Sequence, residues 1–212
     1  MKKIDLKRVF YDVREVEGSK EWYYAKQQKT YDLYDEHNYF NSGNKVENNR
    51  LIFIHYPDGK IIEPVLAKEG QCFGEPVYHN DKLMILLVDF KNDKINIISY
   101  DDNSKKVENI AKFPLSSVKD CYNMKFELNP FMIIRQDGDS FDIIWPEKRE
   151  YKLEPTESFC FIEGEKIYFE KWYDEPEYHQ EIVIKNLRTG EVIERIEGSW
   201  IIMPNGENWI FT

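Results

Sequence analysis

Three acidic residues stand near the starts of three apolar segments of the chain: Glu75, Asp120 and Glu157. Glycoside hydrolysis needs two or more carboxyl groups that project into one cavity, one acting as the acid and another as the base or nucleophile. If the three segments surround a common axis, their carboxylates meet there and become candidate catalytic residues. The chain has 39 Asp and Glu residues, so a surface role for the same three also fits the sequence.

Acidic and aromatic residues interleave in several other stretches, and the densest runs from Trp172 to His179. An aromatic ring stacks on a sugar, and a carboxylate accepts hydrogen bonds from its hydroxyls. The same combination also binds a basic protein. Strand alternation predicts that half of this stretch points into the core. The alternative is that the acidic loops only keep the protein soluble. The candidate ligand-binding residues are Trp172, Tyr173, Asp174, Glu175, Tyr178, His179, His37, Tyr39, Asp137 and Asp139.

Other chemistry finds little support in the sequence. Asp137-Gly138-Asp139 lacks the spaced carboxylates of a Ca²⁺ loop and predicts a turn. The three cysteines are far apart, without the close pairs of a zinc site, so we expect small buried residues. Neither a nucleophile motif nor a phosphate-binding glycine pattern is present. The sequence therefore predicts no metal and no cofactor.

The elements that position these residues follow a repeat of about 40 residues, in which an inner hairpin precedes an outer one. Short runs rich in Ile, Val, Tyr and Phe flank turns of Gly, Asn, Asp and Pro, which is typical of hairpins. The inner hairpins are predicted at Glu21–Tyr34, Gly74–Phe90, Cys121–Asp137, Phe159–Tyr173 and Ser199–Thr212. The outer hairpins are predicted at Arg50–Gly70, Lys94–Pro114, Ser140–Pro155 and His179–Gly198.

The fifth inner hairpin has no outer partner after it, and Lys2–Gly18 supplies one from the other end of the chain. We therefore predict an all-β fold, a five-bladed β-propeller of four-stranded antiparallel blades whose last blade is shared between the two termini. A four-bladed ring with an N-terminal appendage is the alternative. The polar region Tyr31–Asn49 can hold a short helix. The inferred architecture resembles that of five-bladed hydrolases of the arabinanase type, in architecture alone.

Composition narrows the class of partner. The net charge of −10 and the absence of basic clusters disfavour nucleic acid. No stretch approaches the ~20 apolar residues of a membrane helix, and the N-terminus lacks the apolar run of a signal peptide. No linker interrupts the chain, so we expect a single domain, 1–212, in the cytoplasm.

The function that the sequence favours is a non-enzymatic binding or scaffold module that presents an acidic, aromatic loop face to a protein partner. The alternative is a carbohydrate-binding or glycoside-hydrolase-like protein that uses carboxylates at the mouth of the channel. The oligomeric state stays open.

Overall fold

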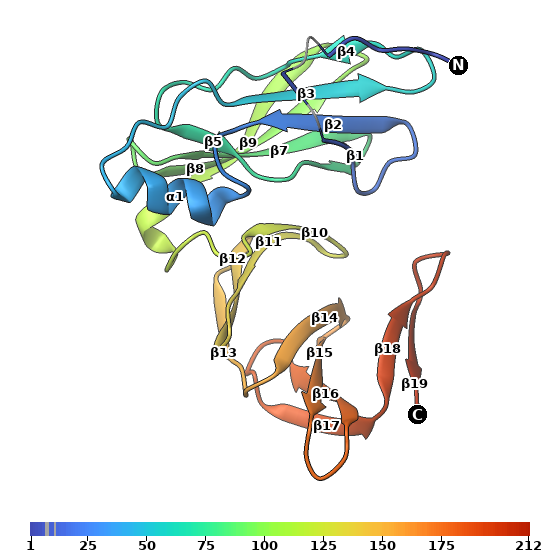
Figure 1. The fold of residues 1–212 in the computed structure, drawn as a ribbon. Coiled ribbons are helices and arrows are strands. Elements are labelled where there is room, and N and C mark those ends of the chain that lie inside the picture. The colour runs from blue at the N-terminus through green and yellow to red at the C-terminus, as the bar shows by residue number, and fades with distance from the viewer. Residues whose placement is uncertain (7–8, 11) are drawn as a thin grey trace. The chain divides into compact units, whose positions relative to one another are not determined.

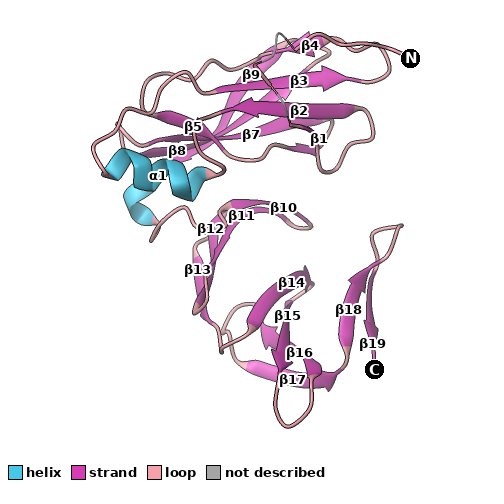
Figure 2. Cartoon of the chain, viewed as in Figure 1, coloured by secondary structure: helices cyan, strands magenta, loops and turns pink. Residues whose placement is uncertain are grey.

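A computed structural model describes residues 1–6, 9–10 and 12–212. These residues are mostly strand, with one α-helix and one short 3₁₀ helix, η1 (Leu115–Ser117), as Figure 2 shows. The strands form four sheets of four or five strands and one two-stranded sheet. The predicted all-β class and the repeated four-stranded antiparallel sheets are confirmed. The chain divides into two compact units, 1–131 and 132–212. The single domain stays a prediction.

The first unit contains two sheets that share one apolar core (Figure 1). Trp22 and Phe53 of the first sheet pack with Phe73, Leu83 and Ile85 of the second. Successive side chains of a strand point to opposite faces, so alternate residues reach this core. The first sheet has the order β1 (Val13–Glu15), β2 (Trp22–Gln27), β3 (Arg50–His55) and β4 (Ile61–Ile62). The second has the order β5 (Gln71–Phe73), β7 (Lys82–Asp89), β8 (Lys94–Asp101) and β9 (Lys106–Phe113), and β6 (Val77–His79) also pairs with β7.

The predicted hairpin Glu21–Tyr34 is wrong, because only its first half is a strand. Helix α1 (Leu33–Asn41) follows β2, which confirms a short helix in the polar region. The Asp32 side chain accepts a hydrogen bond from the Asp35 N–H at 2.9 Å and caps the first turn. Neither α1 nor any other helix in the described part of the chain is long and apolar enough to cross a membrane.

The third sheet begins in the first unit, and the boundary between the units falls after Phe131, the first residue of β11. In the second unit, Phe141 of this sheet and Phe169 of the fourth sheet belong to one buried cluster. The third sheet has the order β10 (Lys125–Leu128), β11 (Phe131–Gln136), β12 (Ser140–Trp145) and β13 (Arg149–Lys152). The fourth has the order β14 (Glu157–Glu163), β15 (Lys166–Tyr173), β16 (His179–Asn186) and β17 (Val192–Glu197).

The last predicted blade requires a correction. Strands β18 (Ser199–Ile202) and β19 (Asn208–Phe211) form a sheet of their own, whereas β1 pairs with β2 in the first sheet. Strand β1 thus pairs with β2, the next strand along the chain, because a short turn is enough to connect them. Lys7, Arg8 and Tyr11 of the predicted Lys2–Gly18 hairpin lie outside the described residues. These strand pairings therefore do not form a last blade that is shared between the two termini.

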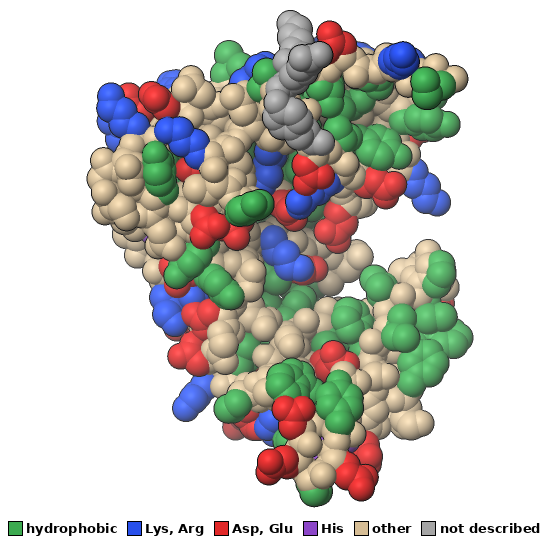
Figure 3. All heavy atoms as spheres, in the orientation of Figure 1, with side chains coloured by type: hydrophobic (Ala, Val, Ile, Leu, Met, Phe, Trp, Pro, Cys, Tyr) green, Lys and Arg blue, Asp and Glu red, His purple; other side chains and the backbone are tan. Residues whose placement is uncertain are grey.

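One side of the two-stranded sheet is apolar and covered. Trp200 and Ile210 pack against the fourth sheet. On the other side, Ile201, Trp209 and Phe211 are about half exposed, and Figure 3 shows hydrophobic side chains gathered over these two strands. A two-stranded sheet is marginally stable by itself, so its contact with the fourth sheet is what holds it in place.

Candidate functional site

Glu157, one of the three predicted catalytic acids, lies in a buried ion pair of the second unit. Its carboxylate oxygen Oε1 is 2.7 Å from the Lys185 ammonium, and both side chains are almost fully buried. Oε2 accepts a hydrogen bond from the Glu154 N–H at 2.7 Å. Lys185 also lies over the ring of Phe169, 4.7 Å from its centre. The pair joins β14 to β16, so Glu157 serves the structure and is not accessible to a substrate.

Asp137 belongs to a second ion network, at the turn between β11 and β12. The Arg135 guanidinium is fully buried and pairs with the carboxylates of Asp137 and Asp142. Asp137 also accepts hydrogen bonds from the N–H groups of Asp139 and Ser140, at 3.1 and 3.2 Å. These contacts close the turn, as the sequence predicts. They leave the Asp139 side chain exposed and engage Asp137 in structural contacts.

The candidate residues His37 and Tyr39 lie on helix α1. The His37 ring stacks on Phe90, with ring centres 5.2 Å apart and planes 5° apart, and burial lowers the pKa of His37. Tyr39 accepts a hydrogen bond from the Lys29 ammonium at 3.4 Å. Asp120, the third predicted catalytic acid, accepts a hydrogen bond from the Tyr122 N–H at 2.8 Å. His37 is therefore a packing residue of the first unit.

The hairpin of β15 and β16 brings the densest predicted cluster together. The register pairs Tyr173 with His179, and their rings stack with centres 4.5 Å apart and planes 5° apart. The Tyr173 hydroxyl donates a hydrogen bond to Glu181 at 2.9 Å. His179 Nδ1 donates to the Glu177 carbonyl oxygen, also at 2.9 Å. Within each adjacent pair, Tyr173 and His179 are half-buried and flank the tip of the hairpin, while Trp172 and Tyr178 are exposed.

The tip of this hairpin, residues 172–178, exposes both aromatic and acidic side chains. Trp172 is 41% exposed and Tyr178 is 65% exposed. The three acids between them are all exposed, and none of their carboxylates has a hydrogen-bond or ion-pair partner in the described chain: Asp174, Glu175 and Glu177. Many other surface acids are paired, as Glu63 is with Arg50 and Glu69 with Lys91. The tip therefore offers unused charge beside two exposed rings.

Charge is divided unequally between the two units. The second unit has 18 Asp and Glu residues against 9 Lys and Arg, a net charge of −9. The first unit, with 21 against 20, carries −1. A concentrated charge of one sign attracts ligands of the other sign and speeds their association. The negative potential of this protein therefore centres on the unit that carries the hairpin tip.

Glu75, another predicted catalytic acid, lines a cavity of about 210 Å³ in the first unit. Its lining includes Arg14, Glu17, Tyr24, Glu75, Lys125 and Phe126. They come from β1, β2 and β10 and from the segments that follow β1 and precede β6. A parallel bridge between Glu17 and Val77 holds two of these segments together. The cavity is thus built on strands of the first unit.

The Glu75 carboxylate pairs with Arg14 at this cavity, and both side chains are about half exposed. Arg14 Nη1 donates a hydrogen bond to Glu75 Oε1 at 2.9 Å, and Nη2 pairs with Asp12 at 2.7 Å. Burial raises the pKa of Tyr24 to about 12, and the Glu75 carboxylate acts in the same direction. Tyr24 therefore keeps its proton at neutral pH and remains a hydrogen-bond donor. Burial also raises the pKa of Glu17.

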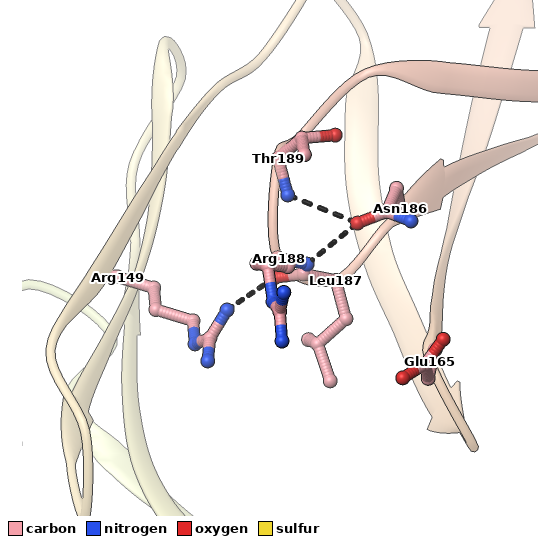
Figure 4. Close-up of a pocket in the computed structure, with 6 residues that line it drawn as sticks. All are labelled: Arg149, Glu165, Asn186, Leu187, Arg188 and Thr189. Carbon is pink, nitrogen blue, oxygen red and sulfur yellow. Dashed lines mark hydrogen bonds between the residues drawn. The ribbon is translucent and has the colours of Figure 1, made fainter.

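A second cavity, of about 390 Å³, lies against the turn between β16 and β17 and is drawn in Figure 4. The Asn186 side-chain oxygen accepts hydrogen bonds from the N–H groups of Arg188 and Thr189, at 2.9 and 3.0 Å. Arg149 donates to the Leu187 carbonyl oxygen at 2.9 Å. Most of these polar groups bond to one another and fix the turn, so we do not assign a ligand to this cavity.

Within the described residues, no group of three or more His, Cys, Asp or Glu side chains is arranged to hold a metal ion. The sequence does not point to Arg14, Glu17 or Tyr24, because the repeat assigns Arg14 and Glu17 to a distant outer hairpin and no motif marks Tyr24. Their position becomes evident only when β1 pairs with β2, which places Arg14 opposite Tyr24.

No family model and no curated protein matches the chain. Several solved structures resemble it at low identity. A prolyl endopeptidase matches with a TM-score of 0.46 and 8% identity, over 91% of this chain and 29% of the other. A bifunctional GH43-CE protein of Bacteroides eggerthii has a TM-score of 0.42 and 11% identity, over 99% and 32%. Hydrazine synthase of Kuenenia stuttgartiensis has a TM-score of 0.43 and 11% identity, over 97% and 57%. The chain spans less than two thirds of the length of each of these proteins.

Proposed function

We propose that the protein is a binding module whose second unit captures a basic segment of a partner protein at the tip of the β15–β16 hairpin. The observation that carries the proposal is the tip itself, where three carboxylates without partners lie between the exposed rings of Trp172 and Tyr178. Arginine and lysine side chains pair with such carboxylates and lie over aromatic faces. Tryptophan and tyrosine are also the residues that most often dominate the energy of an interface.

Two further features support this role. The hairpin is held next to its tip by the stacked rings of Tyr173 and His179 and by the hydrogen bond from Tyr173 to Glu181. Little conformational freedom is therefore lost when a partner binds. The net charge of −9 on this unit draws a basic partner toward it. The negative charge favours a cationic ligand over an acidic one.

Charge reversal at the tip is expected to weaken partner capture about tenfold or more, because attraction is replaced by repulsion. The variant is Asp174→Lys, Glu175→Lys and Glu177→Lys. The measurement is quantitative mass spectrometry of proteins captured by the wild-type and variant chains from an extract of the source cells.

The matched control reverses three exposed acids elsewhere in the same unit: Glu163→Lys, Glu165→Lys and Glu194→Lys. It changes the net charge by the same amount and two of its sites lie at the far end of β15. Retained capture by the control and loss by the tip variant support the proposal. Equal loss in both shows that net charge alone matters, and unchanged capture by the tip variant removes the tip from the interface.

A second candidate function, saccharide binding, is favoured by the cavity of the first unit. Glu75 supplies an acceptor for hydroxyl groups, and the neutral Tyr24, which is almost fully buried, presents its hydroxyl group beside Glu75 as a donor. The volume of about 210 Å³ suits a ligand of the size of a single sugar ring. We propose this site in place of the predicted arrangement of Glu75, Asp120 and Glu157. In that arrangement Glu157 is not accessible, because it is buried in an ion pair with Lys185.

A further inference from the structure

Carboxylates outnumber cations at the cavity of the first unit. Three acids line it together with two cations, Arg14 and Lys125: Glu15, Glu17 and Glu75. Both cations are already paired with further acids, Arg14 with Asp12 at 2.7 Å and Lys125 with Glu127 at 2.8 Å. Lys26 also interacts electrostatically with Glu75 and Arg14, and the eight groups together carry a charge of −2. An anionic ligand is repelled from such a cavity, and a positively charged group on the ligand is attracted.

Glu17, like Glu15, is an acid of the cavity lining without a counter-ion among the described residues. Its carboxylate has no hydrogen-bond or ion-pair partner within the part of the chain that the structure describes. Burial and the nearby Glu127 raise the pKa of Glu17, while Lys125 opposes them. An ammonium group beside Glu17 supplies the missing counter-charge.

The backbone at Glu17 is held by a hydrogen bond to the neighbouring segment, so the position from which its side chain extends is defined. The Tyr78 N–H donates a hydrogen bond to the Glu17 carbonyl oxygen at 2.7 Å. The next residue, Gly18, has a φ of +85°, and a Cβ there would lie 2.3 Å from the Tyr78 carbonyl oxygen. Only glycine permits this close approach of the two segments. The cavity wall that carries Glu17 is thus preorganised for binding.

We infer that the cavity selects an amino sugar, with the ammonium group beside Glu17 and the ring hydroxyls toward Glu75 and Tyr24. The inference rests on the second proposed function, saccharide binding at this cavity, and adds the charge of the ligand. One ion contact at a solvent-exposed site is worth about fivefold in affinity. D-glucosamine is therefore expected to bind about fivefold more tightly than D-glucose, and D-glucuronate more weakly than either.

The test is ligand-observed NMR titration of the full chain with these three sugars at neutral pH. The key variant is Glu17→Gln, which keeps the size of the side chain and removes its charge. It is expected to bring the affinity for glucosamine down to that for glucose measured on the same variant. Glu47→Gln, at an exposed acid elsewhere in the same unit, is the control and is expected to keep the preference.

The outcomes separate the two claims. A glucosamine preference that Glu17→Gln abolishes and Glu47→Gln preserves supports the inference. Equal binding of glucosamine and glucose, tighter binding of glucuronate, or a preference that survives Glu17→Gln overturns the inference while saccharide binding stands. If none of the three sugars binds, saccharide binding at this cavity fails and the inference fails with it.

Discussion

Replacement of Lys185 by methionine is expected to lower the free energy of unfolding of the second unit by about 3–5 kcal/mol. The substitution leaves the Glu157 carboxylate buried without its 2.7 Å partner, and a lone buried charge carries a large desolvation cost. The cation over the Phe169 ring is lost as well. Urea denaturation followed by tryptophan fluorescence measures the effect, because four of the five Trp residues lie in this unit.

A double variant separates the ion pair from side-chain packing. Glu157→Gln together with Lys185→Met removes both charges, and an uncharged pair in the interior is often as stable as an ionic one. Most of the loss is therefore expected to be recovered. Lys166→Met, at an exposed lysine of β15, controls for the loss of a positive charge and is expected to be neutral within about 0.5 kcal/mol. A single variant as stable as the wild type contradicts the structural role given to Glu157.

Arg135→Met is expected to cost about 3 kcal/mol, because Arg135 is the fully buried cation between the Asp137 and Asp142 carboxylates. Burial already raises the pKa of Asp142, and Arg135 opposes that rise. In the variant the pKa of Asp142 rises further, so folding takes up a proton in the range above the ordinary value of 3.8. The loss of stability should therefore shrink as the pH is lowered through this range.

The measurement is urea denaturation at a series of pH values, with Arg188→Met as the control. Arg188 is exposed and its side chain has no ion-pair partner in the described chain, so its replacement should change stability little at any pH. A loss that is the same at every pH would show that Arg135 acts through packing rather than through its charge.

The turns of this fold could be read from the sequence because each rests on local backbone chemistry. Pro57-Asp58-Gly59 joins β3 to β4, and Arg188-Thr189-Gly190 joins β16 to β17, with both glycines at positive φ. The strand pairing at the N-terminus could not be read in this way. The repeat assigned Lys2–Gly18 to the far end of the chain, whereas the short connection to β2 decided the pairing.

The candidate site was predictable from the sequence only where it depends on local strand alternation. Alternation along β15 and β16 predicts that one residue of each pair, Trp172-Tyr173 and Tyr178-His179, is packed, and Tyr173 and His179 are the two that are half-buried and stacked. The pairing of Glu157 with Lys185 had no local signal, because the two residues are brought together only by the order of strands in the fourth sheet. His37 likewise lies on helix α1, where its ring packs on Phe90, and not on the predicted loop face.

Site-specific photo-crosslinking at the hairpin tip tests the central claim, that the second unit binds a basic protein segment there. A photoreactive amino acid replaces Tyr178 in one sample and Tyr31 in the other, a residue of the first unit that is 94% exposed. The account predicts a defined adduct with a basic protein from position 178 only, and its loss when Asp174, Glu175 and Glu177 are reversed to lysine. The same adduct from both positions, or from position 31 alone, would contradict the account.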